Sequence, residues 1–243
     1  MTMPLAIGSE SSSARFAIYW APPIGSSLDR LGAAWLGRDA GGADVPRLAI
    51  PGLDDASWAK LIQAPRLYAL HATLKPPFFL ADGATEAELK AAIQALAGEV
   101  APFSLPLLRL SLLDGFIALL PSAPSPPLDA LAARCVMDLD RFRRPARPEE
   151  LARRRSAGLT ARQDRNLMRW GYPYVLDDFR FHVTLTERVD AETAATLLSS
   201  LSGPLSHAVD TTYAVTDIAL FVQPDPDAPF HQSSRFRLSA QGG

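Results

Sequence analysis

The spacing of hydrophobic residues changes several times along the chain, and each change predicts a different element. A mostly apolar run over Arg15–Pro23 predicts a strand. A helix follows, because leucine and tryptophan residues recur at the helical period after the Ser26-Ser27 pair, which offers an N-cap. Glycine and proline then predict a loop over residues 37–52. A short helix is expected over Asp55–Gln63, ending before Pro65.

Strand and helix patterns continue to alternate through the rest of the chain. The clearest helix is predicted over Thr85–Val100, where Thr85 and Glu88 form a capping-box pattern. A hairpin is expected around Asp114-Gly115. The other expected elements are strands at Tyr68–Leu74, Phe103–Leu110, Phe116–Leu120, Phe179–Leu185, Tyr213–Phe221 and Ser234–Leu238, and helices at Leu128–Phe142 and Ala191–Leu201.

Each half of the chain therefore carries a strand, a helix and then a pair of strands. This self-similarity predicts an α+β fold with two pseudo-symmetric lobes, each a mostly antiparallel sheet with flanking helices, around a central cleft. We expect one bilobal domain over residues 1–243, with the first lobe at 15–125 and the second at 126–243.

Two histidine motifs occupy matching positions in the two halves. His71-Ala72-Thr73-Leu74 and His182-Val183-Thr184-Leu185 share the pattern His-x-Thr-Leu, and their histidines lie 111 residues apart. Because side chains alternate along a strand, His71, Thr73 and Lys75 are expected on one face. By the same rule, Arg180, His182 and Thr184 share a face in the second motif. Each polar face thus carries a histidine, a threonine and a cation.

Two such faces that converge on one cleft would suit phosphodiester cleavage. One imidazole can take a proton from water while the other gives a proton to the leaving oxygen, and both titrate near neutral pH. The hydroxyls of Thr73 and Thr184 can donate to phosphoryl oxygens, while Lys75 and Arg180 offset the anionic charge. The pattern therefore predicts in-line cleavage without a metal or another cofactor.

The motifs and their flanks resemble the 2H phosphoesterases, a family named for two His-x-Thr/Ser-hydrophobic motifs. The segments Pro65–Leu80 and Trp170–Val189 look like a bacterial branch associated with phosphonate-utilisation gene clusters. The resemblance extends from about Arg15 to Leu238. It implies a bilobal α+β fold with a central cleft and metal-independent phosphodiester chemistry. His71, Thr73, His182 and Thr184 match the motif residue by residue.

Three further side chains near the motifs suit a phosphorylated ligand. Arg66 has the chemistry of a phosphate ligand, and Tyr68 and Tyr174 could line a cleft wall. Strict alternation points Arg66 and Tyr68 away from His71, so only a bulge or a turn would bring them in. For Tyr174, ordinary aromatic packing is an equal alternative.

Composition narrows the class of protein and of partner. The chain has 243 residues with 24 Lys+Arg against 26 Asp+Glu, which argues against a strongly basic platform for long RNA. The single cysteine, Cys135, excludes an intrachain disulfide and a Cys-rich metal site. No stretch reaches the roughly 18 apolar residues of a membrane helix, and the N-terminus has no signal-peptide pattern. We therefore expect a cytoplasmic protein that does not bind membranes.

The stretch Arg141–Arg155 holds seven arginines and leaves two interpretations. It could be a solvated helix end and linker, or a patch that captures an anionic substrate such as RNA. His207 and His231 lack the motif partners and are expected to be structural. Two histidines without a converging carboxylate pair do not indicate a metal site.

The leading hypothesis is a hydrolase that cleaves a small, cyclic phosphodiester by paired-histidine acid–base catalysis. In the phosphonate setting of the resemblance, a sugar phosphate is the expected substrate. The alternatives are a 2′,3′-cyclic nucleotide or RNA-end phosphoesterase, and a non-catalytic protein that binds a phosphorylated ligand. The intact motifs count against the last, because binding alone does not require two titratable groups.

Overall fold

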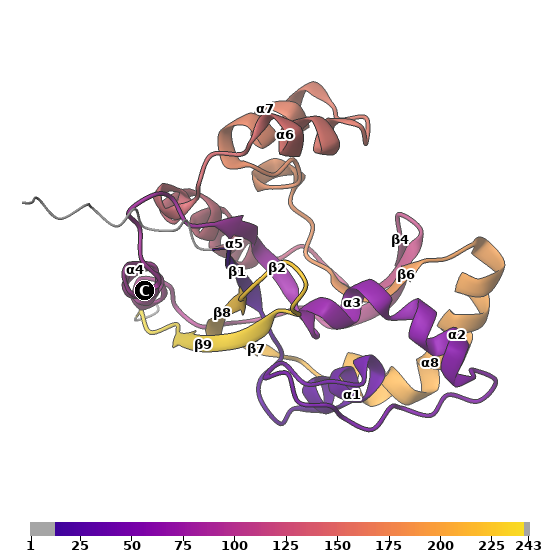
Figure 1. Ribbon diagram of the computed structural model, residues 1–243. Helices are drawn as coiled ribbons and strands as arrows, with labels where there is room; N and C mark the ends of the chain where they lie inside the picture. Colours follow the sequence, from indigo (N-terminus) through magenta and orange to yellow (C-terminus); the bar gives the residue numbers. More distant parts are fainter. Residues whose placement is uncertain (1–12, 241–243) are drawn as a thin grey trace, which may run out of the picture.

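The structure, a computed structural model, describes residues 13–240, which form three antiparallel sheets with helices packed around them (Figure 1). Residues 1–12, where the sequence shows no signal-peptide pattern, lie outside the described residues. Among the described residues we find no helix with the length and hydropathy of a membrane span. The expected α+β class with antiparallel sheets and flanking helices is confirmed.

The four-stranded sheet has the order β2-β1-β8-β9, and every neighbouring pair is antiparallel. A three-stranded sheet has the order β4-β5-β6, and β3 pairs with β7 in a short ribbon. The strand bounds are β1 Arg15–Trp20, β2 Ala72–Phe79, β3 Phe103–Ser104, β4 Leu108–Leu113, β5 Phe116–Pro121, β6 Val183–Arg188, β7 Ala214–Val215, β8 Asp217–Gln223 and β9 His231–Arg237.

Both larger sheets combine strands from the two halves of the chain. In the first, β1 pairs with β2 on one side and with β8 on the other. In the second, the β4–β5 hairpin pairs with β6. The expected division at residues 125 and 126 therefore does not separate the sheets. Hydrophobic spacing predicts where a strand lies but not which distant strand it pairs with.

Helices cover the sheets on several sides. Helix α4 packs against β8 and β9, α5 against β2, and α8 against β4 and β5, while α3 contacts β6. The bounds are α1 Ser27–Leu36, α2 Asp55–Leu61, α3 Gln63–Tyr68, α4 Glu86–Gly98, α5 Pro126–Asp138, α6 Pro148–Arg155, α7 Ala161–Trp170 and α8 Ala191–Val209, with 3₁₀ turns η1 Asp140–Phe142 and η2 Leu176–Asp178.

The helix caps and the hairpin turn that the sequence predicts are present in the structure. Ser26 caps α1 by accepting from the Asp29 amide, and Thr85 and Glu88 form the capping box of α4. At the tip of the β4–β5 hairpin, Asp114 and Gly115 have φ values of 47° and 91°. Such a pair of positive φ values is what a two-residue hairpin turn requires.

The structure differs from the sequence prediction just before the first motif. The expected strand Tyr68–Leu74 begins only at Ala72, because Gln63–Tyr68 forms helix α3. Pro65 does not end a helix here but lies in the first turn of α3. At that position a helix needs no amide hydrogen bond, so proline is tolerated. The second motif also starts late, since β6 begins at Val183.

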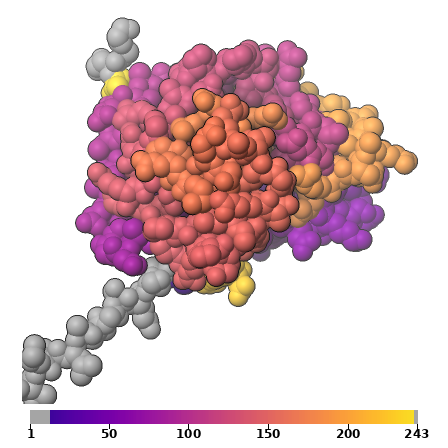
Figure 2. Space-filling view, turned by 90° about the horizontal axis from the view of Figure 1, so that it is seen from above, coloured from indigo at the N-terminus to yellow at the C-terminus, as the bar shows by residue number. Residues whose placement is uncertain are grey.

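Helices α6 and α7 were not expected from the sequence. No residue of α6 is buried, and only Leu167 of α7 is, so neither helix carries an apolar stripe. In Figure 1 the two helices stand above the sheets. Seen from above, the same orange segment lies over the middle of the molecule (Figure 2). Of the Arg141–Arg155 stretch, residues 148–155 form α6, which makes up a helical cap together with α7, and residues 143–147 connect this cap to η1.

Candidate active site

The two histidine motifs meet at one cavity of about 430 Å³. Strand β2 is an edge of the four-stranded sheet and β6 is an edge of the three-stranded sheet. His71, Thr73 and Thr184 line the cavity. His182 lies beside it, because its ring centroid is 5.7 Å from that of Phe116, which also lines the cavity. Side chains from both halves of the chain thus gather at one site.

A backbone carbonyl fixes the tautomer of the neutral His71 ring. The Nδ1 atom lies 3.0 Å from the carbonyl oxygen of Ala69. Because a carbonyl only accepts, Nδ1 carries the hydrogen and Nε2 keeps a lone pair. The Thr73 Oγ1 atom is 3.3 Å from Nε2, so its hydroxyl donates to that lone pair. Ala69 has φ of 56°, an unusual value for a residue other than glycine, at the turn between α3 and β2.

His182 is held in the same way. Its Nδ1 atom lies 2.7 Å from the carbonyl oxygen of Arg180. In both motifs the accepting carbonyl belongs to the residue two positions before the histidine. Each ring therefore leaves Nε2 as the nitrogen that can exchange a proton with a ligand.

Burial keeps His71 neutral. Burial, with a smaller contribution from the nearby His182, lowers the pKa of His71 to about 4, although the hydrogen bond to the Ala69 carbonyl acts in the opposite direction. The Tyr19 ring stacks on the imidazole with centroids 3.9 Å apart. A histidine with these surroundings is unprotonated at neutral pH and can serve as a general base.

The depressed pKa of His71 predicts a pH-dependent stability. Below pH 6.5 the unfolded chain binds a proton that folded His71 refuses, so the free energy of unfolding should fall as pH drops from 6.5 to about 4. In His71→Gln this fall in the free energy of unfolding should be smaller by up to about 3 kcal/mol, because each pKa unit corresponds to about 1.4 kcal/mol. Urea unfolding at both pH values measures the difference. The exposed His207→Gln control should keep the wild-type slope, and an unchanged slope in His71→Gln would contradict the assignment.

Three arginines give the cavity a net positive lining. Arg15, Arg154 and Arg188 line it, against one carboxylate, that of Glu187. That carboxylate accepts from the Ala64 amide at 2.7 Å and so is already engaged at the start of α3. An anion such as a phosphoryl group therefore suits the cavity.

Sequence reasoning did not single out Arg15 or Arg188, although Arg15 carried a signal. Arg15 and Tyr19 lie four residues apart on β1, which pairs with β8 without a register shift. They therefore share a face, and both line the cavity. Arg154 belongs to the Arg141–Arg155 stretch, for which anion capture was one interpretation, but α6 lacks an apolar pattern that would orient this arginine towards the cavity.

Lys75 does not lie where alternation predicted. Tyr19 pairs with Thr73 and Ile18 with Lys75, so Leu74 is an extra residue in the ladder. This bulge turns Lys75 away from the face of His71 and Thr73, and its side chain is 1% exposed. Lys75 Nζ donates to the Val136 carbonyl at 2.9 Å and lies 3.6 Å from Asp140 Oδ1. Burial lowers its pKa to about 8.

Arg180 does not lie where alternation predicted, and Arg66, which alternation pointed away from His71, is not brought to the cavity by a turn. Arg180 precedes β6, so strand alternation does not apply to it, and its exposed side chain lines a different cavity beside Phe179 and Phe181. Arg66 lies on α3 and pairs with Asp44 at 2.8 Å. Neither arginine lines the cavity of the histidine motifs.

The tyrosines divide between the cavity and the surface. Tyr68 lines the cavity because it ends helix α3, and its ring stacks on Phe230 with centroids 5.1 Å apart. Tyr174 is 44% exposed and does not line the cavity. It packs edge-on against Tyr172, which does line the cavity.

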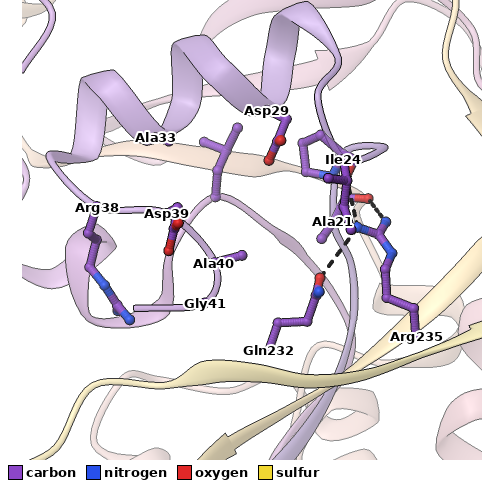
Figure 3. A pocket seen from close by; sticks show the side chains of 12 residues that line it. Ala21, Ile24, Asp29, Ala33, Arg38, Asp39, Ala40, Gly41, Gln232 and Arg235 are labelled. Atoms are coloured by element: carbon purple, nitrogen blue, oxygen red, sulfur yellow. Dashed lines mark hydrogen bonds between the residues drawn. The ribbon is translucent and has the colours of Figure 1, made fainter. Parts of the chain in front are cut away.

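A second cavity, of about 210 Å³, also contains charged residues but offers no free cation (Figure 3). Arg235 donates to the carbonyls of Ala21 and Pro22 and pairs with Asp217 at 2.6 Å. Arg38 donates to the carbonyls of Arg66, Leu67 and Phe230. These guanidinium groups tie strands and loops together. In the part of the chain that the structure describes, no three His, Cys, Asp or Glu side chains gather in a metal-binding arrangement.

Curated relatives match most of this chain in sequence. Ribose 1,5-bisphosphate phosphokinase PhnN of Janthinobacterium sp. (strain Marseille) is 35% identical over 245 residues, covering 99% of this chain and 54% of the relative. The protein of the same name from Laribacter hongkongensis (strain HLHK9) is 38% identical over 217 residues, covering 89% and 50%. The chain thus spans about half the length of these curated relatives.

Solved structures with some likeness include E. coli LigT in its apo form, with a TM-score of 0.44 and 17% identity over 95% of this chain and 100% of that chain. Kluyveromyces marxianus Usb1 has a TM-score of 0.36 and 12% identity over 95% and 99%. A family model described as "Protein of unknown function (DUF1045)" matches residues 73–231. Because this match covers more than half of the chain, the protein belongs to the DUF1045 family.

Proposed function

We propose that the protein is a metal-independent phosphodiesterase of the 2H type that hydrolyses a small, cyclic phosphodiester. One observation carries the proposal: the paired His-x-Thr motifs lie at one cavity, where backbone carbonyls fix both Nδ1 atoms as donors. The positive lining by Arg15, Arg154 and Arg188 supports an anionic substrate. The lack of a gathered ligand set among residues 13–240 favours chemistry without a metal.

In the proposed reaction His71 is the base and His182 the acid. A water molecule attacks phosphorus, and His71 Nε2 takes its proton as the new P–O bond forms. The bond from phosphorus to the leaving oxygen breaks, and His182 donates a proton to that oxygen. Because the phosphodiester is cyclic, the ring opens and the product is one molecule that carries a phosphomonoester and the freed hydroxyl. The low pKa of His71 supports its role as base, since the ring is unprotonated before the reaction.

Thr73 and Thr184 are proposed to hold the phosphoryl group. Both hydroxyls line the cavity, one from each motif. The Thr73 hydroxyl donates to His71 in the free protein and would turn to a phosphoryl oxygen when substrate binds. Charge that develops on the phosphoryl oxygens is stabilised by such preorganised donors and by the arginines.

A sugar phosphate is the substrate class we favour. The curated relatives are named as kinases of ribose 1,5-bisphosphate, which is a phosphorylated sugar. Their phosphokinase activity is not assigned to this chain, which spans only about half of their length. The resemblance to the branch associated with phosphonate gene clusters supports the same class. A 2′,3′-cyclic nucleotide or an RNA end is the second candidate.

A screen of cyclic phosphates in the presence of EDTA tests the proposal. We expect hydrolysis of at least one sugar or nucleoside cyclic phosphate, followed by ³¹P NMR as the ring phosphorus becomes a monoester. Activity should be the same with and without the chelator, because the site offers too few convergent metal ligands. Activity lost in EDTA and restored by a divalent ion would contradict the mechanism. No turnover of any phosphodiester would favour a binding protein instead.

A further inference from the structure

A third cavity, of about 330 Å³, adjoins the cavity of the histidine motifs. The two share Arg15, Pro77 and Arg154 as lining residues. The additional lining comes from the helical cap and the segment before it, and it includes Arg143, Arg144 and Arg153. A ligand that occupies the first cavity can therefore extend into the second past the shared arginines.

This arginine cavity has more positive charge than its carboxylates balance. Five of its lining residues are arginines, and Glu150 is the one acidic lining residue. Arg143 is satisfied by Asp140, through contacts of 2.8 Å and 3.2 Å, and by the Arg169 carbonyl. Glu150 accepts from Arg144 Nη2 at 3.2 Å. Asp140 and Glu150 thus balance Arg143 and Arg144, and the other three arginines of the cavity remain.

The other three arginines have no carboxylate partner within residues 13–240. Arg15 donates to the neutral Gln223 Oε1 at 2.5 Å. Arg154 lies over the Tyr172 ring at 4.8 Å. The side chain of Arg153 makes no hydrogen bond or ion pair to another described residue. Burial lowers the pKa of Arg154, Tyr172 and Glu150 act in the opposite direction, and the nearby positive charges of Arg153 and Arg15 add to the lowering. An anion bound among them would relieve this repulsion.

Arg144 supplies a second, independent observation. Its Nε atom is buried without a hydrogen-bond partner, one of two such side-chain atoms in the described part of the chain. The guanidinium lies 4.4 Å from the Phe79 ring centroid and has one carboxylate contact. A buried, unpaired N–H is costly unless a ligand or a water accepts from it. The guanidinium groups of the cavity in Figure 3 are, by contrast, engaged with backbone carbonyls.

We infer that the arginine cavity binds a phosphomonoester group carried by the same substrate whose phosphodiester lies at His71 and His182. This inference rests on the proposed function. A phosphomonoester is nearly dianionic at neutral pH and offers three terminal oxygens. It can therefore accept hydrogen bonds from several guanidinium groups at once, and it suits this cavity better than a ligand carboxylate does. The substrate is then a small phosphorylated sugar with two phosphorus groups at different positions, rather than a simple cyclic phosphate.

Binding of a matched pair of sugar phosphates tests the inference without requiring turnover. Glucose 6-phosphate and glucose 1,6-bisphosphate differ by one phosphomonoester, and isothermal titration calorimetry in EDTA gives the Kd of each. We expect the wild-type protein to bind the bisphosphate at least about tenfold more tightly, as one added charge-assisted contact set allows. In the Arg144→Met, Arg153→Met double variant this ratio should fall towards 1.

The control is the Arg165→Met, Arg169→Met double variant, which removes two exposed arginines of α7 that do not line the cavity. It should keep the wild-type ratio, so that loss of net charge alone is separated from loss of the site. Equal or absent binding of the two sugars by the wild type would overturn the inference, as would a ratio that survives in the Arg144→Met, Arg153→Met double variant. Failure of the EDTA screen with an intact binding ratio would instead count against the proposed hydrolysis and not against the anion site.

Discussion

Replacing either motif histidine by alanine should reduce kcat by about 10²- to 10⁴-fold, the usual contribution of a general acid or base. His71→Ala removes the ring that is neutral at pH 7, and His182→Ala removes its partner beside Phe116. The double variant should lose much less than the product of the single losses, because groups that act as a unit are not additive. Steady-state kinetics on the substrate found in the screen measures these values.

Two controls separate catalysis from folding. Circular dichroism and urea unfolding should show that both histidine variants are folded. Thr73→Ala and Thr184→Ala should cost less than either histidine change, since each removes a single hydroxyl donor. Near-wild-type turnover in a folded histidine variant would contradict the mechanism. Changed affinity without any turnover in the wild type would favour a binding protein.

Asp140→Ala should destabilise the fold by about 3 kcal/mol, since removing one partner of a buried ion pair leaves the other charge uncompensated. Asp140 lies 3.6 Å from the buried Lys75 Nζ and accepts from Arg143 at 2.8 Å. Lys75→Met removes the buried charge and keeps most of its apolar stem, so stability should change by less than about 1 kcal/mol. Urea unfolding of the two variants gives the comparison.

A surface pair provides the matched control for this prediction. Asp138 pairs with Arg134 at 2.9 Å with its side chain 40% exposed, so Asp138→Ala should cost no more than about 1 kcal/mol. Lys75→Met should also keep wild-type kcat, because Lys75 lies outside the cavity. A large loss of kcat in a stable Lys75→Met variant would restore the original expectation that this lysine binds substrate.

The part of the candidate site that the sequence could predict is that His71, Thr73 and Thr184 lie at one cavity. The His-x-Thr spacing requires only that β2 and β6 present alternate residues to one side, and Thr73 and Thr184 do line one cavity. Caps and the hairpin turn were predictable for a similar reason, because they depend on residues close in sequence, such as Thr85 with Glu88 and Asp114 with Gly115.

The features that could not be predicted depend on contacts between distant residues. Lys75 follows a one-residue bulge that is set by pairing with β1, and no residue type within the motif signals it. Arg154 reaches the cavity from a helix without an apolar stripe. The lobes were divided wrongly because β8, far along the chain, pairs with β1. Strand pairing of this kind is decided by the whole core rather than by local pattern.

The pH dependence of kcat/KM tests the central claim, that His71 and His182 act as base and acid on one phosphodiester, most directly. We predict a bell-shaped profile for the wild type, with the acidic limb set by the low pKa of His71. The acidic limb should disappear in His71→Ala and the basic limb in His182→Ala. A bell-shaped profile that is unchanged in either histidine variant would contradict the account.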